Sequence, residues 1–174
     1  MKTRVPRFFL LAFFAISFVY CSTYQSGISR DADLPPADPQ LLYRYITQES
    51  KYTTWDLWPG KGKLYEGKPP HGAFLTTYLN EAAVSSIKAG REMADGAMIV
   101  KENYSPEKEL AAVTVMYKIR GFYSSGGDWF WAKYGPDGSV QKAGKVDGCI
   151  NCHSARADND YIYTGDFVRK RGGY

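Results

Sequence analysis

The chain has 174 residues and a formal net charge of +4, which comes from 22 basic and 18 acidic side chains. The basic residues are spread along the chain and form no dense block of the kind that follows a phosphate backbone, so we expect no nucleic acid partner. After an N-terminal targeting segment about 150 residues remain, which is enough for one domain with a hydrophobic core.

Residues 1–22 are typical of a secretory signal peptide. A short basic start precedes an apolar run over Phe8–Val19. Such a run is shorter than the roughly 20 residues that span a bilayer, and its position predicts export to the periplasm. An uncleaved membrane anchor is the alternative. Cys21 lies where the signal would be cut and would carry the lipid of a lipoprotein, but Tyr20 stands where a lipidation site has a small residue.

Residues 23–38 are polar and rich in proline, and we interpret them as a flexible lead-in. Asp38 is a good N-cap and Pro39 suits a first helical turn. Apolar residues then recur at helical spacing, which predicts a helix near 39–50. Residues 55–70 are rich in glycine, proline and aromatic side chains, and we expect an ordered loop there.

The middle of the chain predicts a sheet. Short β-rich runs are bounded by turn residues, and a helix is expected over 81–90, where Gly90 would stop it. Short connections between neighbouring strands indicate a largely antiparallel sheet, and flanking helices would complete one α+β domain over 39–174. The expected strands cover residues 73–79, 97–102, 110–118 and 128–134.

The motif Cys149-Ile-Asn-Cys152-His153 has the C-x-x-C-H spacing of a haem c attachment site. Positions three and four residues apart share one face of a helix. Both thiols can therefore reach the two vinyl groups on one edge of the macrocycle, while the imidazole lies below the iron as the proximal ligand. The sequence thus predicts one covalent haem c per chain, attached near the C-terminus.

Two alternatives for the cysteine pair are a redox dithiol and half of a zinc site. A structural zinc site needs four ligands, whereas the other histidine of the chain is His71 and the other cysteine is Cys21, in the signal region. A thioredoxin-like motif normally follows an early strand of a βαβ pattern, and this motif is late in the chain. Haem attachment takes place outside the cytoplasm, so the export signal favours haem c.

The sixth coordination position of the iron has four candidate ligands. A lone histidine in a Pro-Gly turn is typical of a structural hydrogen bond, and a methionine on an alternating strand is typical of a core. The sequence therefore names no sixth ligand and is compatible with an open site. Open iron binds small molecules such as NO, CO or hydroxylamine, whereas closed iron transfers electrons. The candidates are His71, Met93, Met98 and Met116.

Lys101 is a candidate pocket residue because it lies at the end of an apolar strand. Successive strand residues face opposite sides of a sheet, so either Lys101 or Glu102 should point toward the core face. A lysine directed into a haem pocket would be desolvated and would lose its proton more readily, which makes its amine nucleophilic. The alternative is an ordinary strand-end charge in solvent.

Five segments taken together resemble those of the cytochrome P-460 family, and the likeness covers roughly residues 40–168. The late haem motif combined with a Val-Lys-Glu strand is the most specific part of this resemblance. The segments are Pro70–Tyr78 (PHGAFLTTY), Gly96–Glu102 (GAMIVKE), Gly127–Trp131 (GDWFW), Cys149–His153 (CINCH) and Asp160–Thr164 (DYIYT).

The resemblance implies a periplasmic protein with a mostly antiparallel sheet, often a homodimer, and one haem that is five-coordinate through His153. In the enzymatic members of the family a lysine at the position of Lys101 is covalently bonded to the porphyrin, and these members oxidise hydroxylamine. A redox partner cytochrome would take the electrons. The related cytochromes c-prime-beta share the fold, lack the cross-link and bind NO or CO.

One departure from the enzymatic members concerns the distal side of the haem. Those members place polar groups there, including a carboxylate, and residues 112–116, which would align with that region, contain no acid. Three functions thus stay open: an oxidoreductase for hydroxylamine or NO in which Lys101 tunes the haem, a gas-binding cytochrome, and a simple electron carrier. The optical spectrum would distinguish them. The oxidoreductase should show a strongly red-shifted ferrous Soret band, the gas-binding cytochrome a high-spin spectrum and the electron carrier a low-spin spectrum.

Overall fold

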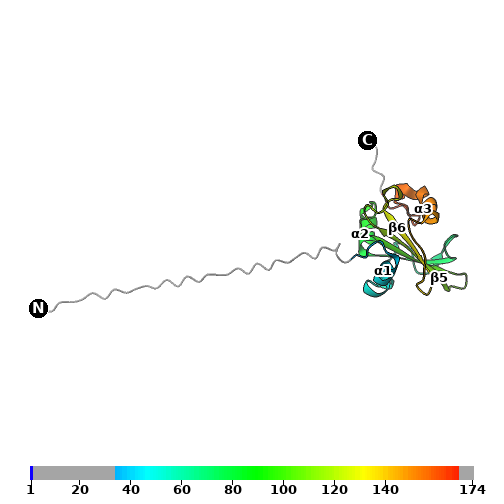
Figure 1. The fold of residues 1–174 in the computed structure, drawn as a ribbon, viewed down its shortest axis with the longest axis horizontal. Coiled ribbons are helices and arrows are strands. Elements are labelled where there is room, and N and C mark those ends of the chain that lie inside the picture. Colours follow the sequence, from blue (N-terminus) through cyan, green and yellow to red (C-terminus); the bar gives the residue numbers. More distant parts are fainter. Residues whose placement is uncertain (2–33, 169–174) are drawn as a thin grey trace, which may run out of the picture.

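The computed structural model describes Met1 and residues 34–168, so the predicted signal peptide and Cys21 lie outside the described residues. The described part forms one antiparallel sheet with helices on both faces (Figure 1). This is the mainly antiparallel α+β fold that the sequence predicts. None of the helices in the described part has the length and apolar character needed to cross a membrane.

The sheet has seven strands in the order β1-β3-β4-β5-β6-β7, and β2 pairs with β3 beside this path. The four predicted strands are β3 to β6. Two unpredicted strands, β1 and β2, are two residues long and lie inside the expected loop, and β7 is an exposed edge strand without apolar alternation. The strands are β1 (Asp56–Leu57), β2 (Tyr65–Glu66), β3 (Phe74–Leu79), β4 (Met98–Tyr104), β5 (Leu110–Lys118), β6 (Trp129–Tyr134) and β7 (Val140–Gly144).

The first predicted helix begins, and the second ends, at the residue that the sequence indicates. Asp38 caps α1 by accepting a hydrogen bond from the Leu41 amide at 2.8 Å, and Gly90 ends α2 in the left-handed conformation, with φ of +65°. The predicted helix over 39–50 changes to a π-helix after its first six residues. The helices are α1 (Pro39–Arg44), η2 (Tyr45–Glu49, π), η3 (Tyr52–Thr54), α2 (Glu81–Ala89), η4 (Ser124–Gly126), α3 (Asp147–His153) and η5 (Ser154–Asn159).

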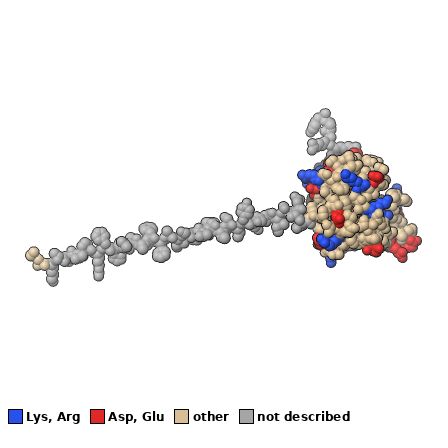
Figure 2. Space-filling view, in the orientation of Figure 1, with Lys and Arg blue, Asp and Glu red and all other residues tan. Residues whose placement is uncertain are grey.

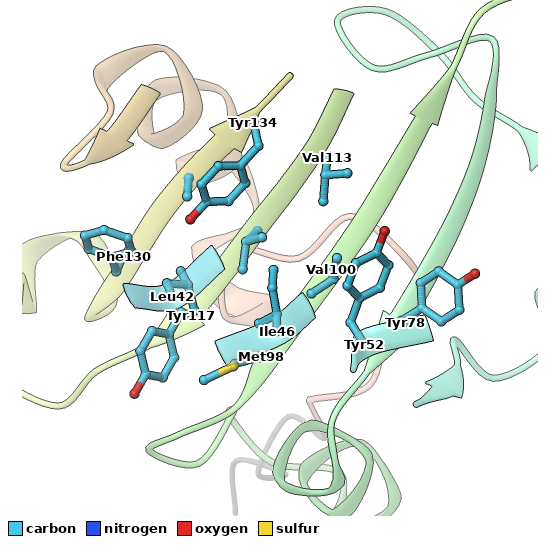
Figure 3. Packing of buried hydrophobic residues seen from close by; sticks show 12 residues of the cluster. Leu42, Ile46, Tyr52, Tyr78, Met98, Val100, Val113, Tyr117, Phe130 and Tyr134 are labelled. Atoms are coloured by element: carbon cyan, nitrogen blue, oxygen red, sulfur yellow. The ribbon is translucent and has the colours of Figure 1, made fainter. Parts of the chain in front are cut away.

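One face of the sheet is covered by α1 and η2. Leu42 and Ile46 are fully buried in one cluster with Met98 and Val100 of the central strand β4 (Figure 3). The N-terminal approach to α1 also packs here, because the Tyr117 hydroxyl donates a hydrogen bond to the Pro35 carbonyl at 2.9 Å. This face is a closed aromatic and aliphatic core.

The opposite face carries α2 and α3. Strand residues one position away from those of the first core point to this side, because side chains alternate along a strand. Ile99, Trp129 and Trp131 form a second buried cluster, against which Cys149 and Ile150 of α3 pack. The cysteine motif therefore lies on this second face. On the outer surface, basic and acidic side chains are mixed over the side that Figure 2 shows.

Candidate functional site

The cysteine motif forms the helix α3, as its spacing predicts. Cys149 is half-buried and Cys152 is exposed, and both thiols are free. His153, the last residue of the helix, is 9% exposed. Two thiols and one imidazole thus belong to the same helical turns, on the second face of the sheet.

His153 is held in one orientation by the segment that follows it. Its Nδ1 donates a hydrogen bond to the Tyr161 carbonyl at 2.6 Å, since a carbonyl oxygen can only accept. Nε2 therefore keeps a free lone pair, and a backbone carbonyl on the other nitrogen is the usual support of a metal-binding histidine. Burial lowers the pKa of His153, against the opposing effect of this hydrogen bond. The neutral imidazole is the form that binds metal.

Aromatic rings surround the His153 imidazole. Its centroid lies 4.7 Å from that of Trp131, 5.5 Å from that of Tyr163 and 6.3 Å from that of His71. The buried Trp131 Nε1 has no hydrogen-bond partner among the described residues. These aromatic rings and the unpaired indole N–H would suit a flat apolar group with a few acceptor atoms.

Asp160 anchors the segment that holds His153. Its carboxylate accepts from Lys118 Nζ at 2.6 Å and from the Met93 amide at 2.7 Å, while its carbonyl accepts from Trp129 Nε1 at 3.1 Å. Because Asp160 precedes Tyr161, these bonds fix the carbonyl that orients the imidazole. The sequence alone places Asp160 only within a resembling segment, because its partners are brought together by the tertiary structure.

The substitution Asp160→Asn is expected to lower the free energy of unfolding by about 3 kcal/mol, because it leaves the Lys118 ammonium buried without its counter-charge. The side chains of the pair are 13% and 4% exposed. Denaturant unfolding followed by tryptophan fluorescence measures the effect. As a control, Glu49→Gln removes the exposed Arg44–Glu49 pair and should cost less than about 1 kcal/mol. Equal losses in the two variants would contradict the anchoring role of Asp160.

Lys101 lies on the same face of the sheet as Trp131. It pairs with Thr77 on β3 and with Thr114 on β5, and Thr114 pairs in turn with Lys133 on β6. Residues paired in this way share a face. The Lys101 amine makes no hydrogen bond or ion pair with the described residues. Burial lowers its pKa to about 8.

Glu102 points to the opposite face and is also buried. Its carboxylate accepts from the Tyr52 hydroxyl at 3.0 Å and from the Tyr104 hydroxyl at 2.7 Å. Burial and this charge raise the pKa of Tyr78 to about 12. We expected either Lys101 or Glu102 to face a core. Both do, on opposite sides of the sheet, because both faces of β4 are covered. The carboxylate is thereby kept on the side of the sheet away from His153.

The fold places the four candidates for the sixth iron ligand at different positions relative to His153. Met98 belongs to the core on the opposite face, and Met93 is buried in the cluster around Trp129. Met116 is on the His153 face, where it pairs with Trp131. His71 is the candidate whose ring contacts the His153 ring. Burial and the nearby Lys101 charge lower the pKa of His71 to about 4, so it is neutral at physiological pH.

The donor set fits a haem. Two free thiols three residues apart and an imidazole with an oriented Nε2 are what covalent attachment and axial ligation need. For the alternative of a zinc site, the described residues contain no cluster of three or more His, Cys, Asp or Glu side chains that could hold a metal ion.

An antiparallel sheet that supports a C-x-x-C-H helix with a carbonyl-anchored histidine defines a haem-binding cytochrome domain. The family model of cytochrome P460 matches residues 50–164, and the chain belongs to the cytochrome P460 family. Membership of this family implies a haem cofactor. A comparison with curated proteins found no match.

Proposed function

We propose that this protein is an exported c-type cytochrome of the periplasm that oxidises hydroxylamine or NO at one haem per chain. Cys149 and Cys152 hold the haem by thioether bonds, His153 is its axial ligand, and the sixth position is open to the substrate. Bound haem supplies an iron centre that exchanges electrons with the substrate and with a partner cytochrome. Export rests on the predicted signal peptide.

The observation that carries the enzymatic proposal is the position of Lys101. Its amine is desolvated, lacks a partner among the described residues and lies on the same face as His153. A pKa of about 8 leaves about a tenth of the amine neutral at pH 7. A neutral amine is nucleophilic, so Lys101 is suited to form the bond to the porphyrin that the enzymatic members of the family carry. The new C–N bond would replace one amine N–H and one C–H of the ring, so two protons would go to solvent and two electrons to an external oxidant such as the partner cytochrome.

A second candidate function is the binding of NO or CO without catalysis. It is favoured by the residues beside Lys101, because Thr77 and Thr114 flank it and the acid Glu102 is on the other face. A pocket with no carboxylate has a weaker means of removing protons from hydroxylamine. Under this alternative Lys101 is unmodified and only lines the pocket.

The test of the proposed function is the consumption of hydroxylamine by the haem-loaded protein with an artificial electron acceptor. We expect turnover, together with a red-shifted ferrous Soret band and rapid binding of CO to the reduced protein. Rapid CO binding without hydroxylamine consumption would support the gas-binding alternative. A low-spin spectrum that CO does not change would indicate an electron carrier and contradict both.

A further inference from the structure

We propose that Tyr161 is a positioning residue of the haem ligand and that Gly127 leaves the space its ring needs. The Tyr161 carbonyl is thereby held on His153, and this hydrogen bond keeps the reduction potential of the bound haem low. The inference rests on the proposed function only in that His153 is taken as the axial ligand. It goes beyond that function because it assigns a role to two residues outside the ligand set.

The backbone makes an unusual turn at the residue that holds His153. Asp160 and Tyr161 both adopt the left-handed conformation, with φ of +52° and +66°. Residues with a Cβ rarely adopt this conformation, and two in succession persist only where other contacts hold them. The Tyr161 carbonyl in this turn lies 2.6 Å from His153 Nδ1. The contacts that hold the turn therefore also set the position of the imidazole.

Side chains anchor both residues of this turn. The Asp160 carboxylate anchors the first residue, and the side chain of Tyr161 anchors the second. The Tyr161 hydroxyl donates a hydrogen bond to the Ser125 carbonyl at 3.2 Å, and its ring packs against the buried cluster of Trp129 and Trp131. The Tyr161 side chain is thus fixed at both ends, by its backbone and by its hydroxyl.

Gly127 leaves the space that this ring occupies. A Cβ atom at position 127 would lie 2.6 Å from Cε2 and 2.7 Å from Cδ2 of Tyr161. Carbon atoms that are not bonded to each other approach to about 3.5–4.0 Å. Gly127 is also left-handed, with φ of +69°, where an added side chain is strained. Because the ring is fixed at both ends, a side chain here would displace the turn and move the Tyr161 carbonyl away from His153.

The hydrogen bond from His153 Nδ1 affects the iron through the imidazole. A group that accepts this hydrogen bond makes Nε2 a stronger donor to a bound metal. A stronger donor stabilises ferric iron more than ferrous iron, so it lowers the reduction potential, and hydrogen bonds to an axial ligand are one means by which a protein sets that potential. A low potential favours the transfer of an electron from the reduced iron to a partner cytochrome.

The test compares Gly127→Ala with Gly138→Ala in the haem-loaded protein. Gly138 is a matched control, because its φ is +82° and an added Cβ would lie 2.7 Å from the Tyr43 ring. Tyr43 packs against the core on the other face of the sheet, away from His153. Both substitutions therefore add a strained residue and a collision with a tyrosine ring, and neither changes a charge.

Redox titration followed by absorption should show a higher potential for Gly127→Ala alone. We expect the ferric-to-ferrous ratio at a fixed applied potential to fall about tenfold, the size typical of a lost outer-shell partner. This corresponds to a rise of about 59 mV for a one-electron couple. Resonance Raman spectra of the ferrous protein should show a lower iron–histidine stretching frequency in the same variant. An unchanged potential in Gly127→Ala, or an equal change in Gly138→Ala, would overturn the proposal.

Tyr161→Ala removes the ring and leaves the glycine in place, so it tests the same role if the Gly127→Ala chain does not fold. We expect a rise in potential of similar size. In the double variant the two effects should not add, because without the ring the Gly127→Ala substitution has no side chain to displace. An unchanged potential in Tyr161→Ala, or additive effects in the double variant, would overturn the proposal.

The outcomes separate this inference from the proposed function, because the potentials are measured without hydroxylamine. A raised potential in Gly127→Ala, in a protein that does not consume hydroxylamine, would support the positioning role of Tyr161 and contradict the oxidase. Hydroxylamine consumption together with equal potentials in Gly127→Ala and the wild type would support the oxidase and contradict the positioning role.

Discussion

Proteolysis of the mature holoprotein is expected to yield the Lys101 peptide joined to the haem peptide that contains Cys149 and Cys152. The physical reason is the placement of a desolvated amine, with a pKa lowered to about 8, on the face of the sheet that carries His153. Peptide mapping by mass spectrometry measures this directly. A free, unmodified Lys101 peptide from fully matured protein would contradict the cross-link and favour the gas-binding cytochrome.

The variant Lys101→Arg tests the same cross-link through the absorption spectrum and the enzymatic activity. Arginine keeps the positive charge but stays protonated and cannot act as a nucleophile. We expect the ferrous Soret band to return to the position of an ordinary c-type haem and hydroxylamine turnover to fall at least about tenfold. The matched control is Lys133→Arg, because Lys133 lies two strands away in the same row. Because both substitutions keep the charge, equal effects would indicate a general consequence of replacing lysine in this row and would contradict the cross-link.

The double substitution of Cys149 and Cys152 by alanine, made together with Lys101→Arg, is expected to abolish haem retention in denaturing electrophoresis, because all the proposed covalent links to the haem are then removed. Haem held only by an axial ligand dissociates when the fold is lost, whereas thioether bonds survive. Haem staining of protein made with the haem c maturation machinery checks this. Each single substitution should retain haem through the remaining bond.

Ser154→Ala, beside the motif in the same part of the chain, is the matched control and should keep its haem. Retained haem in the double variant would show that the attachment site is not the cysteine pair alone. Adding Lys101→Arg to the double variant then decides the origin of that retention. Loss of haem in the triple variant would assign it to Lys101, and continued retention would place the attachment at another residue.

Most of the fold was predicted from patterns within short segments, such as apolar alternation in strands and residues that end helices. In β5, Val113, Val115 and Tyr117 alternate with more exposed residues, and all three are buried against the α1 face. The Gly90 stop of α2 is equally local. The strand β7 was not predicted, because an exposed edge strand needs no apolar alternation. The π-helix after α1 was not predicted, because the apolar spacing there is compatible with an ordinary helix.

The sequence by itself determined that two thiols and one imidazole lie together on one short helix, because the three donors are within five consecutive residues and helical spacing sets their relative positions. The tertiary structure decided what surrounds them. Asp160 meets Lys118 across 42 residues, and His71 meets Asn103 across 32. Strand register decided that Lys101, and not Glu102, faces His153. These contacts depend on how distant strands pair and cross, and periodicity within one segment contains no information about a partner in another.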